Sequence, residues 1–399
     1  MFDAALPAAA AAHEPTADCP MIETVVVQPT AFCNIACTYC YLPSRDQRGV
    51  MAQGTVRRIF ERIFESSYAA PELAVIWHAG EPLAAGLPFY QEAFSAIEAL
   101  RPPDIQIVHS FQTNGMLLSE AWCDLLEQWQ VRVGVSVDGP KALHDAHRVT
   151  RKGLGTFDST MAGIRLLQNR GIPFHALTVL SAASLHDPRG MHDFYAQAGI
   201  DRVCFNVEES EGDHVSDLLG QADHDMLFRS FLEAFWGIAR AEGKVRFVRE
   251  IDGMLPRIIR PPGITFRNPQ TEPLSMLNID RLGRVSTFSP ELLGYQNAAY
   301  DDYIIGDIHR DTLHDIYAAC LRSPMHIAVR EGVARCKKEC GYFSVCGGGA
   351  PVNKLFEAGS FDATQTGYCR LTQMVPTDII LDALDRLPAS VLPNSLPAS

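Results

Sequence analysis

The sequence contains no long hydrophobic run, no excess of positive charge and no secretory signal. None of its 399 residues lies in an apolar run of about 18 residues, so we expect no membrane-spanning helix. Lys and Arg number 34 against 47 Asp and Glu, and the net charge of −13 disfavours nucleic acid and anionic membranes as partners. The N-terminus lacks the basic flank and apolar core of a signal peptide. We therefore predict a cytoplasmic protein in which residues 1–20 form a disordered tail.

The cysteines of this chain are not expected to form a disulfide framework, because a cytoplasmic compartment keeps thiols reduced. Seven of the 11 fall into two groups near opposite ends of the chain: Cys33, Cys37 and Cys40, then Cys336, Cys340, Cys346 and Cys369. Grouped cysteines in a reducing compartment indicate bound metal. We therefore expect two metal or cluster sites.

Residues 22–207 alternate short β-branched or apolar runs with segments of helical periodicity. Strands are predicted at residues 22–28, 73–78, 105–112, 131–137, 174–180 and 202–207, and helices at 56–67, 120–129, 156–170 and 191–198. This alternation favours an α/β fold with parallel strands and right-handed crossovers. Six repeats are too few for a closed eight-stranded barrel, so we predict a partial (β/α)6 barrel over residues 21–210.

Polar, mostly glycine-containing segments follow the predicted strands. CNIACTYC follows the first strand, AGEP the second, TNG the third and SVDG the fourth, and Asn206 to Glu208 end the sixth. In parallel α/β folds the chemistry gathers at the C-terminal ends of the strands. The sequence therefore predicts one active site at this edge of the sheet.

The remainder of the chain has a different texture. Residues 211–265 are predicted to form a bridging helical region with a helix over 223–242. Residues 266–399 are predicted to form a C-terminal domain, with a hairpin over 278–288 that turns at Arg281, Leu282 and Gly283. A short helix is predicted at 313–321, ahead of the cysteine- and glycine-rich segment 336–369.

The first cysteine group has the spacing C-x3-C-x2-C, from Cys33 to Cys40. Thiolates at this spacing can converge on one iron–sulfur cluster, and a cubane cluster needs four ligands. Three cysteines would leave one iron open to another ligand. A structural zinc site with its fourth ligand elsewhere is the alternative, because zinc sites use similar spacings.

The context of this triplet resembles the radical S-adenosylmethionine (SAM) superfamily. Tyr39 precedes the last cysteine, and Ala79-Gly80-Glu81-Pro82 after the second strand is similar to the family's Gly-Gly-Glu segment, with alanine in the first place. The resemblance implies that the three cysteines hold a 4Fe–4S cluster whose open iron is chelated by SAM. One electron from the reduced cluster then cleaves SAM to methionine and a 5′-deoxyadenosyl radical, which abstracts hydrogen from an unactivated carbon.

The same resemblance implies a set of SAM-binding residues. Gly80 would let the backbone approach the methionyl amino group and Glu81 would accept its hydrogen bond, with a plain strand-to-helix turn as the alternative. Ser136 and Arg148 would bind the SAM carboxylate, which an Arg fork matches. The other expected members are Tyr39, Asn114, Asp138 at the ribose, and Val179 at the adenine, where a core valine is the alternative.

The second cysteine group can ligate a cluster completely, and a four-cysteine zinc site is the alternative. Glycines 347–349 beside Cys346 allow tight wrapping and offer backbone N–H groups to the sulfurs. The segment resembles a reduced form of the SPASM domain of radical SAM peptide maturases, whose full pattern carries seven cysteines and two auxiliary clusters. Phe288 and Ala350 stand where that pattern has cysteine, so the resemblance implies one auxiliary 4Fe–4S cluster.

Two C-terminal stretches, 280–294 and 346–354, resemble the cyclophane-forming maturases of glycine-rich-repeat and related peptides. The resemblance implies a crosslink, in a ribosomally made precursor peptide, between an aromatic side-chain carbon and the Cβ of a residue two positions later. It also implies an external electron donor such as flavodoxin or ferredoxin. Glu291 is predicted as the catalytic base. Asp280 is the second candidate, although Asp beside a Gly turn more often serves the turn itself.

Two other functions stay open at this point. A sulfatase-type maturase would oxidise Ser or Cys to formylglycine, and the missing hairpin cysteines count against it. A non-catalytic iron–sulfur or zinc-binding protein would leave the SAM-binding residues without a role. Release of 5′-deoxyadenosine separates an enzyme from a scaffold, and the mass of the modified peptide separates a crosslink from formylglycine made from cysteine.

Overall fold

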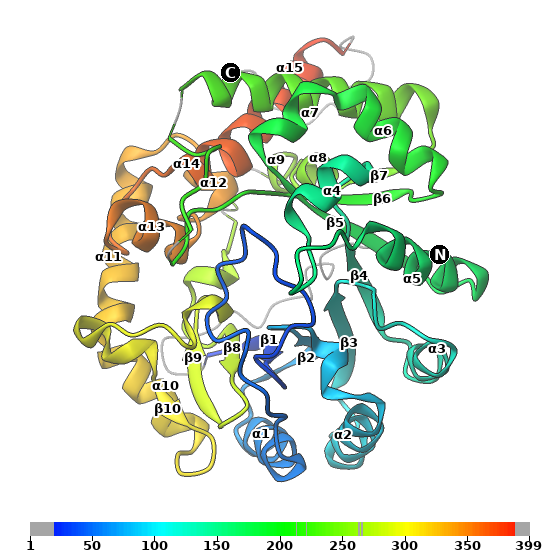
Figure 1. Ribbon diagram of the computed structural model, residues 1–399. Helices are drawn as coiled ribbons and strands as arrows, with labels where there is room; N and C mark the ends of the chain where they lie inside the picture. The colour runs from blue at the N-terminus through cyan, green and yellow to red at the C-terminus, as the bar shows by residue number, and fades with distance from the viewer. Residues whose placement is uncertain (1–19, 213, 221, 262–263, 265, 388–399) are drawn as a thin grey trace.

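The computed structural model describes residues 20–212, 214–220, 222–261, 264 and 266–387 (Figure 1). The predicted disordered tail therefore lies outside the described residues, except for Pro20. No helix in these ranges is long and apolar enough to cross a membrane.

A ten-stranded sheet forms the centre of the fold, in the order β10-β9-β8-β1-β2-β3-β4-β5-β6-β7. The strands are β1 (Ile22–Val27), β2 (Ala69–Trp77), β3 (Gln106–Thr113), β4 (Arg132–Ser136), β5 (Phe174–Leu180), β6 (Arg202–Val207), β7 (Phe247–Val248), β8 (Met276–Ile279), β9 (Arg284–Thr287) and β10 (Gly306–Asp307). Strands β1 to β6 pair in parallel and in chain order, which confirms the six predicted strands.

The sheet is longer than predicted at both edges. Strand β7, from the region expected to be helical, adds in parallel to β6. The predicted hairpin is present as β8 and β9, and β8 pairs in parallel with β1, with Val25 opposite Leu277 and Val26 opposite Asn278. The C-terminal part of the chain is therefore joined to the barrel through backbone hydrogen bonds. Periodicity alone could not reveal this pairing, because it spans some 250 residues of sequence.

Helices cover the outside of the curved sheet, and the C-terminal helices α11–α15 lie at its open side (Figure 1). They are α1 (Gln53–Glu65), α2 (Leu87–Leu100), α3 (Glu120–Gln128), α4 (Lys141–His147), α5 (Phe157–Asn169), α6 (Pro188–Gln197), α7 (Ala222–Glu242), α8 (Arg249–Asp252), α9 (Leu255–Ile258), α10 (Leu313–Arg322), α11 (Pro324–Glu339), α12 (Phe343–Cys346), α13 (Pro351–Ala358), α14 (Gly367–Cys369) and α15 (Val375–Asp385). Helices α1, α3, α5, α6, α7 and α10 match predicted segments; α2, α11 and α15 were not predicted.

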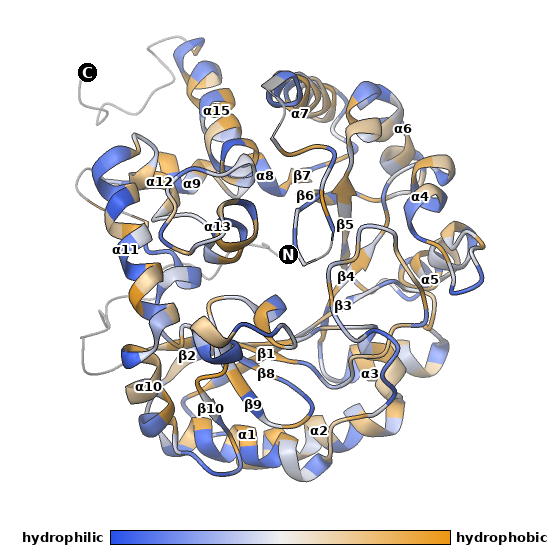
Figure 2. Cartoon of the chain, turned by 60° about the vertical axis from the view of Figure 1, so that its left-hand side comes forward, coloured by the Kyte–Doolittle hydropathy of each residue, from blue (hydrophilic) through white to orange (hydrophobic). Residues whose placement is uncertain are grey.

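The core lies between the strands and the outer helices. Val25, Val26 and Val27 in β1 are at most 2% exposed, as expected for a parallel strand covered on both faces. Trp77 at the end of β2 packs edge-on against Tyr90 of α2, with ring centroids 5.2 Å apart. The outer helices mix hydrophilic and hydrophobic residues along their length (Figure 2). Their apolar sides complete the core, so the loops at the strand ends rest on a rigid frame.

Phe288, which follows β9, occupies a position where the full SPASM pattern has cysteine. Its side chain is fully buried and stacks on His326 of α11, with centroids 6.2 Å apart. Its φ of 71° is unusual for a bulky residue, so the surrounding core must hold it there. The position is an apolar junction between the hairpin and α11.

We expect Phe288→Ala to lower the free energy of unfolding by about 3–5 kcal/mol, because it opens a cavity where the hairpin meets α11. Leu282→Ala is the matched control, since Leu282 lies at the tip of the same hairpin and is 51% exposed. Chemical denaturation followed by circular dichroism measures both. Equal effects of the two substitutions would contradict the junction.

Candidate active site

The first cysteine group lies in the loop between β1 and α1. Figure 1 shows this loop in dark blue at the centre of the molecule, with α12–α14 on one side and β4 and β5 on the other. Cys33 and Cys37 are 9% and 8% exposed, Cys40 is half-buried, and all three are free thiols. Tyr39 and Ile35 pack with Cys33 and Cys37 in a small apolar cluster. The three cysteines thus lie in the loop that follows β1, and their role as cluster ligands stays a prediction.

Arginines fix the path of this loop through its backbone. Arg151 donates two hydrogen bonds to the carbonyl oxygen of Cys33, at 3.0 and 2.8 Å. Arg45 donates to the carbonyl oxygen of Cys37 at 3.1 Å. Neither arginine was named from the sequence, and a positive residue near a cysteine motif offers no periodic signal. These bonds orient the three thiols and bring positive charge to their surroundings.

Asp138, at the end of β4, ties the cysteine loop to the sheet. Its carboxylate accepts hydrogen bonds from Tyr39 Oη at 2.5 Å, from Arg148 Nε at 2.9 Å and Nη2 at 3.1 Å, and from the backbone N–H of Val179 at 3.0 Å. Asp138 and Arg148 are 2% and 6% exposed. Four residues named from the sequence therefore meet in one buried network. Their individual roles toward SAM stay predictions, because two nitrogen atoms of the Arg148 guanidinium are already hydrogen-bonded to Asp138.

Glu81 forms a second network at the ends of β2 and β3. Its carboxylate accepts hydrogen bonds from the backbone N–H of Leu83 at 3.0 Å and of Asn114 at 2.8 Å, and from Thr113 Oγ1 at 2.7 Å. The Asn114 side chain in turn donates to Asn34 Oδ1 in the cysteine loop at 2.7 Å. Burial raises the pKa of Glu81 to about 7, and these donors oppose that rise. Glu81 is thus a structural anchor of the loop, and its contact with SAM stays a prediction.

The backbone around Gly80 has no room for a side chain. Gly80 has a φ of 54°, and a Cβ there would lie 2.4 Å from the carbonyl oxygen of Phe32 and 2.6 Å from that of Ala31. Ala79 also has a positive φ, of 71°, at the place where the Gly-Gly-Glu segment has glycine. The backbone at Gly80 therefore lies close against the segment preceding Cys33, and its approach to the methionyl amino group stays a prediction. Ser136 lies nearby on β4, and its Oγ accepts a hydrogen bond from Gln112 at 3.0 Å.

The second cysteine group lies in the C-terminal helical region. Cys336 belongs to α11, Cys340 follows its end, Cys346 ends α12 and Cys369 ends α14. All are free thiols, and Cys340 is half-buried whereas the other three are buried. The fold thus brings together residues up to 33 positions apart in the sequence.

Backbone and side-chain donors surround these four thiols. The N–H of Gly348 donates to Cys346 Sγ at 3.4 Å, and the N–H of Thr366 donates to Cys369 Sγ at 3.3 Å. Lys354, only 3% exposed, places Nζ 3.3 Å from Cys336 Sγ. Donors aimed at sulfur, with a buried ammonium, suit a negatively charged thiolate cluster. Lys354 was quoted in the sequence pattern, but only the tertiary structure gives it this contact.

Neither cysteine group brings three thiols as close together as a tetrahedral zinc ion requires. Among the His, Cys, Asp and Glu side chains of the described residues, only His192, Asp193 and Glu242 bring three possible metal-ligand atoms within 4.8 Å of one another. No three cysteine sulfurs of either group lie that close together. A tetrahedral zinc ion with Zn–S bonds of about 2.3 Å would hold its sulfurs closer together than that limit. A cubane bonds each thiolate to a separate iron and so accepts a wider spacing. Burial raises the pKa of Cys33 to about 12 and that of Cys37 to about 11, and iron coordination would offset this cost by deprotonating the thiols.

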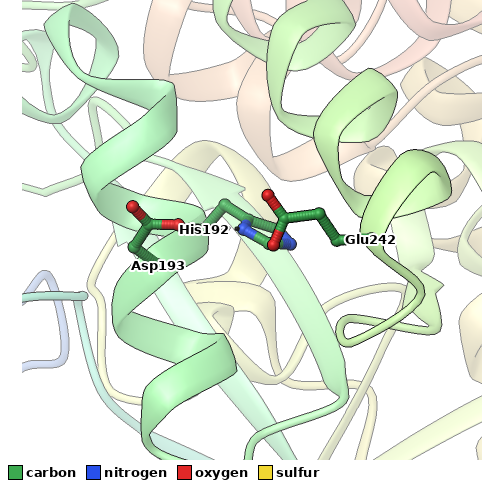
Figure 3. A group of neighbouring side chains, drawn as sticks. All are labelled: His192, Asp193 and Glu242. Atoms are coloured by element: carbon green, nitrogen blue, oxygen red, sulfur yellow. Dashed lines mark hydrogen bonds and ion pairs between the residues drawn. The ribbon is translucent and has the colours of Figure 1, made fainter.

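The group of His192, Asp193 and Glu242 lies apart from both cysteine groups, on α6 and at the end of α7 (Figure 3). Arg189 pairs with Asp193 at 3.0 Å and with Glu242 at 2.7 Å. Because Arg189 already pairs with both carboxylates, we interpret this group as an ion-pair link between α6 and α7 and do not assign a metal site to it.

The two predicted bases lie in different settings. Asp280 accepts from the backbone N–H groups of Leu282 and Arg284 and from the Arg284 guanidinium, so its carboxylate serves the β8–β9 turn. Glu291 lies in the short helical turn Pro290–Leu292 and accepts a hydrogen bond from Tyr41 Oη at 3.3 Å. Tyr41 directly follows Cys40 in the sequence. Its Oε2 atom is buried and receives no hydrogen bond within the described residues. Of the two, Glu291 lies beside the cysteine loop.

Sequence reasoning missed two further carboxylates near Glu291. Glu209 and Glu211 follow β6, and Glu291 acts electrostatically on both. Their signal in the sequence was weak, because a run of acidic residues after a strand is usually a solvated loop.

Comparison with known proteins identifies the fold and the chemistry. A family model described as the radical SAM superfamily matches residues 27–195. An uncharacterized protein of Synechocystis sp., sll1766, is 37% identical over 365 residues, or 90% of this chain and 92% of that protein. The chain belongs to the radical SAM superfamily. The enzyme's cofactors are accordingly SAM and the 4Fe–4S cluster that binds it, which the free, anchored triplet Cys33, Cys37 and Cys40 fits.

Other relatives of this radical SAM enzyme carry names. The serine-type anaerobic sulfatase-maturating enzyme of Bacteroides thetaiotaomicron is 24% identical over 345 residues, or 83% of each chain. The structure of anSMEcpe with bound AdoMet superposes with a TM-score of 0.73 at 20% identity, covering 92% of this chain and 98% of that one. The structure of SuiB from Streptococcus suis bound to the precursor peptide SuiA gives 0.62 at 16% identity, covering 88% and 76%. At these identities the structural likeness establishes the fold alone.

We expect Arg148→Ala to lower the free energy of unfolding by about 3–5 kcal/mol, because it leaves the buried Asp138 carboxylate without its partner. Arg246→Ala is the control: Arg246 pairs with Asp201 but its side chain is 73% exposed, so its loss costs little. Denaturant titrations of both variants under anaerobic conditions provide the comparison. A similar cost for the two would show that the Asp138 network does not anchor the loop.

Proposed function

We propose that this radical SAM enzyme modifies a side chain of a peptide or protein substrate. The observation that carries the proposal is the convergence of the cysteine loop, the Glu81 network and the Asp138 network at the C-terminal ends of β1 to β5. When bound, SAM and its cluster supply the 5′-deoxyadenosyl radical that abstracts hydrogen from substrate. The named relatives support a peptide or protein as that substrate, because sulfatase maturation and SuiA binding both involve polypeptides.

Within this proposal the chain's own residues hold the cofactor and exclude water. Cys33, Cys37 and Cys40 ligate the cluster. Gly80 and Asn114 lie at the ends of β2 and β3, where they would face the methionyl part of SAM. Ser136, Asp138, Arg148 and Val179 would border its carboxylate and nucleoside, with Tyr39 fixing the loop beside them. Burial of this set makes each hydrogen bond to SAM stronger than it would be in water.

Formylglycine formation is the reaction that the named relatives favour. Serine-type and cysteine-type anaerobic sulfatase-maturating enzymes match this chain over 83% and 60% of its length. Such a reaction oxidises a substrate Ser or Cys at Cβ, and a base near the site would accept the proton that is released. Glu291 is the proposed base, because its carboxylate lies beside the cysteine loop and has an oxygen without a donor.

A cyclophane crosslink is the second candidate, and the C-terminal region supports it. Two positions that hold cysteine in the full SPASM pattern hold other residues here: the buried Phe288 after the hairpin, and Ala350. We therefore propose one auxiliary 4Fe–4S cluster, on Cys336, Cys340, Cys346 and Cys369. A cluster ligated only by protein would accept the electron lost at ring closure. Flavodoxin or ferredoxin is the proposed donor to the SAM-binding cluster.

The first test is turnover by the reconstituted enzyme. With SAM and dithionite, we expect the natural enzyme to release 5′-deoxyadenosine and Cys37→Ala to release none, because the variant lacks one cluster ligand. Cys123→Ala is the control, since Cys123 is a buried residue of α3 and belongs to neither group. Normal release from Cys37→Ala would refute the assignment of the triplet.

Mass spectrometry of co-expressed candidate peptides then separates the two reactions. A crosslink and formylglycine from serine both remove two hydrogens, whereas formylglycine from cysteine also exchanges sulfur for oxygen. Hydroxylamine traps only the aldehyde. A trapped product would establish formylglycine, and an unreactive product lacking two hydrogens would establish the crosslink.

The second test is iron content. We expect about eight irons per chain after anaerobic reconstitution, from two four-iron clusters, and about four in a variant lacking Cys33, Cys37 and Cys40. Iron and sulfide assays measure this directly, with Cys320→Ala as a control outside both groups. One zinc and no iron in the triple variant would overturn the auxiliary cluster.

A further inference from the structure

Three carboxylates meet beside the loop that holds Cys40. Glu209 and Glu211 lie within hydrogen-bonding reach of each other, and the charge of Glu291 acts on both. Glu209 Oε2 accepts a hydrogen bond from Asn353 at 2.6 Å, and Glu291 Oε1 accepts one from Tyr41. We name Glu209, Glu211 and Glu291 the acidic subsite.

The acidic subsite lacks a positive partner within the described residues. None of the three carboxylates forms an ion pair there, although 25 such pairs are found elsewhere in the same ranges. Glu211 is 1% exposed, and neither of its oxygens receives a hydrogen bond from a donor; nor does Glu291 Oε2. Arg249, which like Glu209 lies near Tyr368, pairs instead with Glu250 at 2.7 Å.

This arrangement is costly as it stands. Removing a charge from water without a partner costs several kcal/mol, so a native protein keeps such groups only with protons or a counter-ion. Burial, and after it the charge of Glu291, raises the pKa of Glu209 to about 7. Burial, and after it the charges of Glu209 and Glu291, raises the pKa of Glu211 to about 11. The neighbouring groups do not supply the missing positive charge. Burial lowers the pKa of His78, which disfavours its charged form, and raises the pKa of Tyr41 and Tyr368, which keeps them neutral. Glu357 adds a further negative charge.

The position of the acidic subsite suits a substrate contact. Tyr41 directly follows Cys40, while Asn353 lies on α13, seven residues after Cys346. Tyr295 Oη donates to the carbonyl oxygen of Tyr41, its ring packs on Phe356 of α13 at 5.2 Å, and its hydroxyl fills the space beside Gly212. The acidic subsite therefore lies between the loop of the first cysteine group and α13, the helix between Cys346 and Cys369 of the second group.

We propose that the acidic subsite binds a cationic side chain, Lys or Arg, of the substrate polypeptide. The proposal rests on the proposed function and adds a requirement on the substrate: a basic residue near the modified one. A bound ammonium or guanidinium supplies donors to the unpartnered oxygens of Glu211 and Glu291. A divalent metal fits less well, because the three carboxylates do not bring one oxygen each within 4.8 Å of the others.

The test measures binding of n-butylammonium and methylguanidinium, as mimics of Lys and Arg, to the reconstituted full-length enzyme. Isothermal titration at constant ionic strength includes n-butanol as the neutral probe and Mn²⁺ as the metal probe. We expect both organic cations to bind, n-butanol not to bind, and Glu211→Gln to weaken binding about 10- to 150-fold, as for loss of a charge-assisted hydrogen bond. Repeating the titration in buffers of different ionisation enthalpy should reveal proton release.

Glu208→Gln is the matched control. Glu208 is the neighbouring buried carboxylate, but it already pairs with His214 at 2.9 Å, so its loss should leave cation binding unchanged. Glu209→Gln provides a second variant, and iron content confirms that each variant is folded.

Three results would overturn the proposal: no binding of either organic cation, equal binding by Glu211→Gln and the natural enzyme, or Mn²⁺ binding that the Glu211 substitution abolishes. Because the titration needs no turnover, these results would leave the proposed radical chemistry standing. Absence of 5′-deoxyadenosine would refute that chemistry and leave cation binding untouched.

Discussion

The buried ion pair between Asp138 and Arg148 is the interaction on which the arrangement of the site depends. It is expensive to bury, and it is stable because every oxygen of Asp138 receives hydrogen bonds from Tyr39, Arg148 or the backbone of Val179. Through these bonds one carboxylate joins the cysteine loop to the ends of β4 and β5. Glu81 and Asn114 hold the same loop from the side of β2 and β3. The loop that carries the cluster ligands is thereby shaped by the protein itself.

The second constraint is the parallel pairing of β8 with β1. Strand β1 leads into the first cysteine group, and the chain after β8 and β9 leads, through α10 and α11, to the second. The pairing makes both groups part of one sheet-based framework. The proposed transfer of an electron to an auxiliary cluster would need such a fixed relation between the two cysteine groups. The acidic subsite lies within this framework, bounded by Tyr41 on one side and Asn353 on the other.

The assignment of this chain to the radical SAM superfamily rests on one set of observations, and the choice between formylglycine formation and a crosslink rests on another. The superfamily model and the 37% identical relative establish a radical SAM enzyme. The sulfatase-maturating relatives favour formylglycine formation, whereas the buried Phe288 in place of a cysteine favours a single auxiliary cluster and so a different branch of the chemistry. An acidic subsite without a cation of its own adds a substrate property that either reaction can use.

The sequence by itself predicted the six parallel strands, several of the helices and the two groups of cysteines. Runs such as the valines of β1 specify buried parallel strands, and cysteine spacing specifies metal sites, because both signals are local. Only the tertiary structure decided which distant residues meet. Asp138 and Arg148, which were predicted separately as SAM contacts, form one buried ion pair. The carboxylate of Asp280 serves its turn, and Lys354 lies against Cys336. Glu209 and Glu211 gained significance only beside Glu291, some 80 residues away. The physical reason is that burial and charge repulsion depend on neighbours in space, and spacing along the chain does not encode them.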